Sequence, residues 1–152
     1  MVLKDDRQVA LNELVAHCEA TARRYRHAAD ILAGTGSEAA LRRFAAERDG
    51  LTQRLRYQVR RLGDLPDAAN ANRDTQQIFD ESAMARLAAR GATAVLRERI
   101  DGEQRIMALA NAALAEGLPE AVRHILEAAR EDARRTIDLL AQESDRAAAQ
   151  RN

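Results

Sequence analysis

The stretch ERIDGEQRIMALANAALAEGLPEAVRHIL, residues 98–126, carries the features that decide the fold. It reads as the end of one long helix, a short turn at residues 117 and 118, and a second helix that opens with Pro119. A proline in the first turn of a helix loses no hydrogen bond, and a glycine after a helix accepts a left-handed cap. The stretch therefore predicts an antiparallel helical hairpin, with helices over residues 92–116 and 119–145.

Composition and charge narrow the class of protein. Aromatic residues make up 3% of the chain, which has no tryptophan and only two prolines, so an all-α fold is expected. Lys plus Arg and Asp plus Glu are both 24, and this balance argues against a nucleic-acid binder or an anionic membrane partner. The sequence has neither a signal-peptide pattern nor a run of about 18 apolar residues. A single cysteine, Cys18, cannot form an intramolecular disulfide, which suits a cytoplasmic protein.

Two further long helices are predicted over residues 6–33 and 37–62. Between them, Gly34 can adopt a left-handed cap and Ser37 is a favourable N-cap, so these helices form a second hairpin. The first helix has an apolar seam with steps of four and three residues: Leu11, Val15, Cys18, Ala22, Tyr25, Ala29 and Leu32. The second has a comparable face, in which Arg48 takes one place among Leu41, Phe44, Leu51, Leu55, Val59 and Leu62.

The helices of the second hairpin also have one buried face each. The first of them is expected to bury Leu96, Ile100, Glu103, Met107, Ala110 and Leu114. The second is expected to bury Val122, Leu126, Ala129, Ala133, Thr136 and Leu140. The polar tail over residues 144–152 is expected to fray.

A long connection separates the two hairpins. Residues 63–91 begin with turn and loop chemistry, followed by a short helix over residues 75–90 with a capping box at Asp74 and Gln77 and a break at Gly91. Such a connection is long enough to return along the molecule, so the helices over 37–62 and 92–116 would run parallel. The prediction is one domain over residues 1–152, an all-α four-helix bundle with a long crossover. A simple up-down-up-down bundle is the alternative.

Two charged residues fall on predicted core faces. Glu103 is central to the apolar arc of its helix and Arg48 to that of the second helix. The number of residues between each of them and the hairpin turn of its helix is similar, so both should lie at the same height along the bundle. Across the first turn, Ala22 lies opposite Arg48. We therefore predict a buried ion pair between Arg48 and Glu103, a structural polar layer that Asp132 or Glu47 could join. Beside Glu103, Gly102 either allows close approach of a helix or is a tolerated surface glycine.

Three parts of the chain, which together span roughly residues 11–140, are similar to a known family: LNELVAHC followed by YRHAAD, LRRFAAERDGLTQRLRYQVRRLG, and the stretch quoted at the start. With these segments the chain resembles the ferritin-like superfamily and, more narrowly, an uncharacterised bacterial family of small ferritin-like four-helix bundles. The family is described only as a domain of unknown function. The resemblance implies a bundle with one long crossover, and a stress-associated role is an expectation from it.

The iron site of ferritin-like enzymes does not carry over to this sequence. Those enzymes use one glutamate on each of two helices and Glu-x-x-His on each of the other two. Here Glu103 matches, but Ala22 stands at the seam position of the first helix, and Glu47 is followed three residues later by glycine. Glu127 and Glu131 are each followed three residues later by arginine. No complete diiron site and no cofactor are therefore expected.

The remaining candidates are weaker. His17, His27 and His124 each have a carboxylate one helical turn away, a common solvent-face pairing, and Cys18 lies in an apolar seam where a thiol is inert. The short crossover helix has an apolar face that either covers the bundle or binds a protein partner, and its members are Ile78, Phe79, Met84 and Leu87.

Three functions remain open. The first is a non-enzymatic interaction protein, cytoplasmic and homo-oligomeric, most simply a dimer. The second is a metal-binding or redox bundle with a non-standard site made of Glu47, Glu103 and Asp132. The third is an adaptor that binds a helix from another protein in a groove left open by the crossover segment.

Overall fold

The computed structural model describes residues 6–63 and 73–150, and for residues 73–79 it describes the backbone alone. This part of the chain consists of helices joined by turns and contains no strand, which confirms the all-α prediction. The five helices are α1 (Asp6–Ile31), α2 (Glu38–Arg61), α3 (Arg73–Arg90), α4 (Ala92–Leu114) and α5 (Glu120–Ala149). None of them combines the length and the apolar character that crossing a membrane requires.

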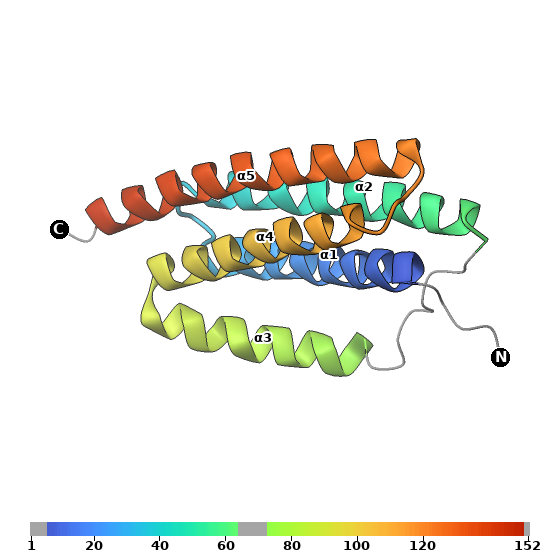
Figure 1. The fold of residues 1–152 in the computed structure, drawn as a ribbon. Coiled ribbons are helices and arrows are strands. Elements are labelled where there is room, and N and C mark those ends of the chain that lie inside the picture. Colours follow the sequence, from blue (N-terminus) through green and yellow to red (C-terminus); the bar gives the residue numbers. More distant parts are fainter. Residues whose placement is uncertain (1–5, 64–72, 151–152) are drawn as a thin grey trace.

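Four of the helices lie side by side, and α3 lies along one flank (Figure 1). The hairpins α1/α2 and α4/α5 are the most closely packed pairs, and α1 also packs against α4. The α2 and α5 helices touch only loosely, while α2 and α4 occupy opposite corners without backbone contact. Because α3 runs back along the molecule, α2 and α4 point in the same direction (Figure 1).

The predicted seams of α1, α2 and α5 face the interior. Every seam position of α1 and α5 is buried, and on α2 only Leu62, just past the helix end, is half-buried. About one seam residue per helical turn therefore drives the packing of each helix, because burial of a large aliphatic side chain contributes roughly 1.5–3 kcal/mol.

The buried face of α4 is rotated by one residue from the prediction. Three expected core positions are only half-buried: Ile100, Met107 and Leu114. The residue before each of them is buried instead: Arg99, Ile106 and Ala113. The physical reason is the position of α4 in the fold. Because α4 packs against three helices, α5, α1 and α3, it buries a wider arc of its surface than a helix that packs along a single seam. The centre of that arc is also shifted.

The apolar core consists of two separate clusters along the bundle axis. The first includes Leu14, Leu55 and Ile106, and the second includes Tyr25, Phe44 and Leu96. Between them lies a layer of buried polar side chains contributed by α1, α2, α4 and α5: Thr21, Arg48, Thr52, Arg99, Glu103 and Thr136. The polar layer therefore divides the interior at mid-height.

Helix α3 covers the flank formed by α1 and α4. Met84 is buried in the second apolar cluster, and Leu87 packs against it. One acidic side chain, Asp80, is also buried, and it binds both Arg23 (3.4 Å) and Arg24 (3.0 Å) of α1. The described half of the predicted apolar face thus covers the bundle, while the side chains of Ile78 and Phe79 lie outside the described residues.

Several predicted boundaries need correction. Helix α3 begins at Arg73, so Asp74 lies inside the helix and is not its N-cap. Ser37 is the N-cap of α2, but its hydroxyl accepts no hydrogen bond from the backbone N–H groups of that helix and instead donates to Glu143 of α5 (2.7 Å). The segment expected to fray is helical to Ala149, because its end packs on the second apolar cluster. The turn and loop predicted over residues 64–72 lie outside the described residues.

The buried carboxylate of Asp80 gives a test of how α3 is held. We expect Asp80→Asn to lower the free energy of unfolding by about 1–3 kcal/mol, because two arginines lose their charged acceptor. Hydrogen exchange should accelerate in the backbone amides of α3 more than in those of α1 or α4. Arg86→Ala, at an exposed position of the same helix, should leave both quantities nearly unchanged. Equal acceleration in all helices would show that Asp80 does not act locally.

Candidate functional site

The polar layer is centred on an ion pair between diagonally opposed helices. Arg48 of α2 donates from Nε to Oε1 of Glu103 of α4 at 2.8 Å. The side chains are 1% and 0% exposed, respectively. Because α2 and α4 have no backbone contact, this bond crosses the centre of the bundle. The structure therefore brings together the two residues that the sequence places at one level.

Two threonines complete the surroundings of Arg48. Its Nη2 atom donates to the Thr136 hydroxyl of α5 at 3.1 Å. That hydroxyl donates in turn to the backbone carbonyl of Asp132 (2.8 Å), and Thr52 donates to the carbonyl of Arg48 itself (2.8 Å). The guanidinium thus links α2 to both α4 and α5. The Glu103 carboxylate compensates its positive charge, which would otherwise lower the folding stability by several kcal/mol when buried.

The second oxygen of Glu103 faces a different environment. Glu103 Oε2 and the Tyr25 hydroxyl are both buried, and neither has a hydrogen-bond partner of normal geometry. The two groups are close enough that each affects the pKa of the other. Burial raises the pKa of Glu103 and outweighs the opposing effect of Arg48. Burial likewise raises the pKa of Tyr25, so its phenol stays protonated and can donate to the carboxylate.

Cys18 lies one helical turn from Ala22, on the same face of α1 as Tyr25. Burial raises the pKa of its thiol to about 12, although Arg48 opposes the shift. A thiol of this kind remains protonated at neutral pH and is a poor nucleophile or metal ligand. Its position agrees with the expectation of a buried, inert cysteine.

A second buried arginine, Arg99 of α4, was not expected from the sequence. It is 1% exposed, its guanidinium lies 5.1 Å from the ring centre of Tyr25, and it donates to the Thr21 carbonyl at 3.3 Å. Its neighbour Gly102 makes this possible, because a Cβ there would lie 3.1 Å from Arg99 Nη2. The available signal was spacing: Arg99 lies four residues before Glu103 and three after Leu96, on one helix face.

Arg99 connects the core pair to the flank covered by α3. Glu98 accepts from Arg99 at 2.6 and 2.7 Å and from Arg24 of α1 at 2.5 Å. Arg24 in turn binds Asp80 of α3. Burial raises the pKa of Glu98, but the bonds and charges of Arg99 and Arg24 outweigh it, and the net pKa is lowered. Polar contacts therefore run from α3 to the bundle centre.

His17 of α1 fixes the close approach of α1 and α4. Its Nε2 atom donates to the backbone carbonyl of Gly102 at 2.9 Å. Gly102 is thus a buried contact residue, which decides between the two interpretations of this glycine. Burial lowers the pKa of His17, and the charges of Arg99, Arg105 and Arg24 lower it further, against the Gly102 hydrogen bond. The ring is therefore held in its neutral form.

The residues of the alternative metal site do not come together. Glu47 is exposed, and Asp132 is half-buried and pairs with Arg135. Both line a groove of about 520 Å³ between α2 and α5, whereas Glu103 lies beneath it in contact with Arg48. Among the described side chains, those of residues 6–63 and 80–150, no group of three or more His, Cys, Asp or Glu is arranged to hold a metal ion.

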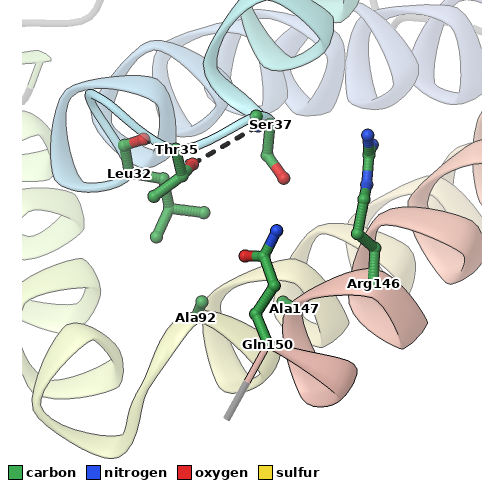
Figure 2. Close-up of a pocket in the computed structure, with 8 residues that line it drawn as sticks. Leu32, Thr35, Ser37, Ala92, Arg146, Ala147 and Gln150 are labelled. Carbon is green, nitrogen blue, oxygen red and sulfur yellow. Dashed lines mark hydrogen bonds between the residues drawn. The ribbon is translucent and has the colours of Figure 1, made fainter.

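The end of the bundle contains a smaller pocket of about 240 Å³ (Figure 2). It lies where the α1–α2 turn, the start of α4 and the end of α5 meet. Thr35 accepts a hydrogen bond from the Ser37 backbone at 3.3 Å, and the side chains of Arg146 and Gln150 extend into the space from α5 (Figure 2). Arg146 is paired with Glu143. No pairing of a nucleophile with a base lines this pocket.

The hydrogen bonds and ion pairs of this polar layer join the helices to one another. A substrate in solvent has no route to the fully buried Glu103 carboxylate unless the bundle opens. Comparisons with models of known protein families, with curated proteins and with solved structures gave no match.

The buried ion pair predicts non-additive stability effects. Glu103→Leu alone should cost about 3–5 kcal/mol of unfolding free energy, because it leaves the Arg48 charge uncompensated in the core. The double variant Arg48→Met/Glu103→Leu should cost less than that single change, since no charge is stranded. Urea unfolding of the wild type, both single variants and the double variant measures the coupling. A double variant as unstable as the sum of the singles would contradict the pair.

The neutral His17 predicts a dependence of stability on pH. Its folded pKa lies below its unfolded value of about 6.5, so its contribution is present above that pH and is lost as pH falls through the folded pKa. Unfolding free energy should therefore drop between about pH 7.5 and about pH 5.5. His17→Gln should reduce this drop, whereas His124→Gln, at an exposed site, should preserve it. An identical drop in all three proteins would exclude His17 as the cause.

Proposed function

We propose that this chain is a ferritin-like four-helix bundle with a long crossover that acts as a non-enzymatic interaction protein. The topology supports the bundle: α2 and α4 are parallel, and the connection between them returns along the molecule through α3 (Figure 1). This is the connection that distinguishes ferritin-like bundles from simple up-down bundles.

The observation that carries the proposal is the position of the Arg48 guanidinium. In a ferritin-like metal site, the carboxylate at mid-bundle faces metal ions. Here Glu103 occupies that level, and Arg48 binds it at 2.8 Å. A metal ion at Glu103 would have to displace a buried, permanently charged side chain, which would then have no acceptor.

The donor set on the other helices supports the same conclusion. Ala22 on α1 offers no donor atom, and Thr136 on α5 offers a hydroxyl that already binds Arg48. Glu47 is exposed and lines the groove between α2 and α5. Glu103 is a single carboxylate and already binds Arg48, so the layer does not supply the number of ligands that two iron ions need. The bundle therefore serves as a scaffold with a fixed register.

The surface between α2 and α5 is the best candidate for contact with other molecules. The groove there is lined by side chains of both charges, including Arg43, Arg54 and Glu47. It is also lined by Leu139, which is 38% exposed. Mixed charge around an accessible apolar side chain is typical of protein interfaces rather than of nucleic-acid sites. We therefore propose that the chain forms homo-oligomers, is cytoplasmic and has a stress-associated role.

Metal content tests the proposal directly. The protein should be purified without a histidine tag, incubated with Fe(II) or Mn(II) under anaerobic conditions, desalted and measured by elemental analysis. We expect well below one ion per chain, because Glu103 is neutralised by Arg48. Stoichiometric iron or manganese would favour a metal-binding or redox bundle instead.

Two variants identify the source of any metal that is found. Glu103→Gln removes the central carboxylate, and Glu47→Gln removes an exposed one at the groove. Metal that is retained in Glu103→Gln but lost in Glu47→Gln would indicate a surface site. Metal that is lost only in Glu103→Gln would place it at the core and would contradict the proposal.

A further inference from the structure

A single residue separates α3 from α4. Helix α3 ends at Arg90 and α4 begins at Ala92, so Gly91 is the whole connection. Its backbone angles are φ 109° and ψ 169°, a region of conformational space that is essentially restricted to glycine. Without a Cβ, Gly91 permits the reversal that folds α3 back along α4.

The sequence around Gly91 is otherwise that of one continuous helix. ESAMARLAARGATAVLRERI, residues 81–100, is rich in alanine, arginine, leucine and glutamate and contains no proline. Met84 and Val95, both buried, are eleven residues apart, which is close to three helical turns. If Gly91 became helical, these two side chains would lie on the same face of one long helix, and the amides after Gly91 would gain helical acceptors.

Gly91 divides the chain into two units, each of which contains one closely packed helical hairpin, and both units contribute residues to both apolar clusters. Helices α1, α2 and α3 precede it, α4 and α5 follow it, and the tightest pairs, α1/α2 and α4/α5, lie within one unit each. The interfaces between the units are smaller, and their polar bonds include Arg48 to Glu103, Arg24 to Glu98 and His17 to Gly102. All of these contacts can form equally well between two chains.

We propose that two copies of this chain exchange halves about Gly91 and form a domain-swapped dimer. In the dimer, α3 and α4 of each copy join into one helix, and the two long helices run antiparallel, so α3 of one copy lies on α4 of the other. Each Glu103 then receives Arg48 from the partner chain. The proposal rests on the homo-oligomeric state proposed above and specifies its interface. A short hinge between otherwise preserved contacts is the arrangement that favours swapping.

A substitution at the hinge tests the proposal. Gly91→Ala disfavours the present backbone angles and favours a helical residue 91, so it should lower the dimer dissociation constant by about tenfold or more. The control is Gly117→Ala: Gly117 also has a positive φ of 69°, but it connects α4 to α5 within one unit. It should weaken monomer and dimer alike and leave the dissociation constant unchanged. Sedimentation velocity over a range of concentrations measures both.

Cross-linking distinguishes a swapped dimer from any other dimer. Glu13 of α1 and Arg105 of α4 form an exposed pair at 3.1 Å across the two units. Single-cysteine chains Glu13→Cys and Arg105→Cys, each with Cys18→Ala and Gly91→Ala, are mixed, unfolded, refolded and treated with a short bis-maleimide. The control pair, Arg26→Cys and Asp49→Cys, lies within one unit at 3.0 Å.

The outcomes separate the two proposals. A dimer in which residues 13 and 105 of different chains cross-link, while residues 26 and 49 do not, establishes the exchange. A dimer without the 13–105 product overturns the exchange but leaves a homo-oligomer formed through another surface. A protein that stays monomeric in the wild type and in Gly91→Ala overturns both the exchange and the homo-oligomeric state. Mass spectrometry of the cross-linked peptides identifies the product.

Discussion

The bond between Arg48 and Glu103 is the interaction on which the rest of the structure depends. It joins α2 to α4, which occupy opposite corners of the bundle and have no backbone contact. Hydrophobic packing alone specifies the register of two helices less strictly, because apolar side chains can repack when one helix slides by a turn. A buried ion pair does not allow this, since each misaligned register strands two charges in the interior. The pair therefore fixes the level at which the two hairpins meet.

Other polar contacts extend this constraint to every helix. Thr136 brings in α5, and Tyr25 brings in α1 through its hydroxyl near Glu103 and its ring beneath Arg99. Arg99 leads through Glu98 to the arginines that hold Asp80 of α3. The two apolar clusters lie on either side of this layer, so each can pack independently while the layer sets their relative position.

Much of this arrangement could be predicted from the sequence, and the exceptions have physical causes. The seams of α1, α2 and α5 follow from helical periodicity, and equal distances from two hairpin turns placed Arg48 and Glu103 at one level. The burial of Arg99 could not be predicted, because it depends on the space left by Gly102 and on a hydrogen-bond acceptor from α1. Both become apparent only when the helices are packed together. The extension of α5 was missed for a similar reason, because contacts from other helices stabilise its polar end.

The most direct test of the account is a high-resolution crystal structure with anomalous data collected at the iron and manganese edges, from crystals grown with both metals present. If Arg48 neutralises Glu103, the density will show the Arg48 guanidinium within hydrogen-bond distance of Glu103 and Thr136, and no anomalous peak will occur at that level. An anomalous peak beside Glu103, with the guanidinium turned toward the groove between α2 and α5, would contradict it.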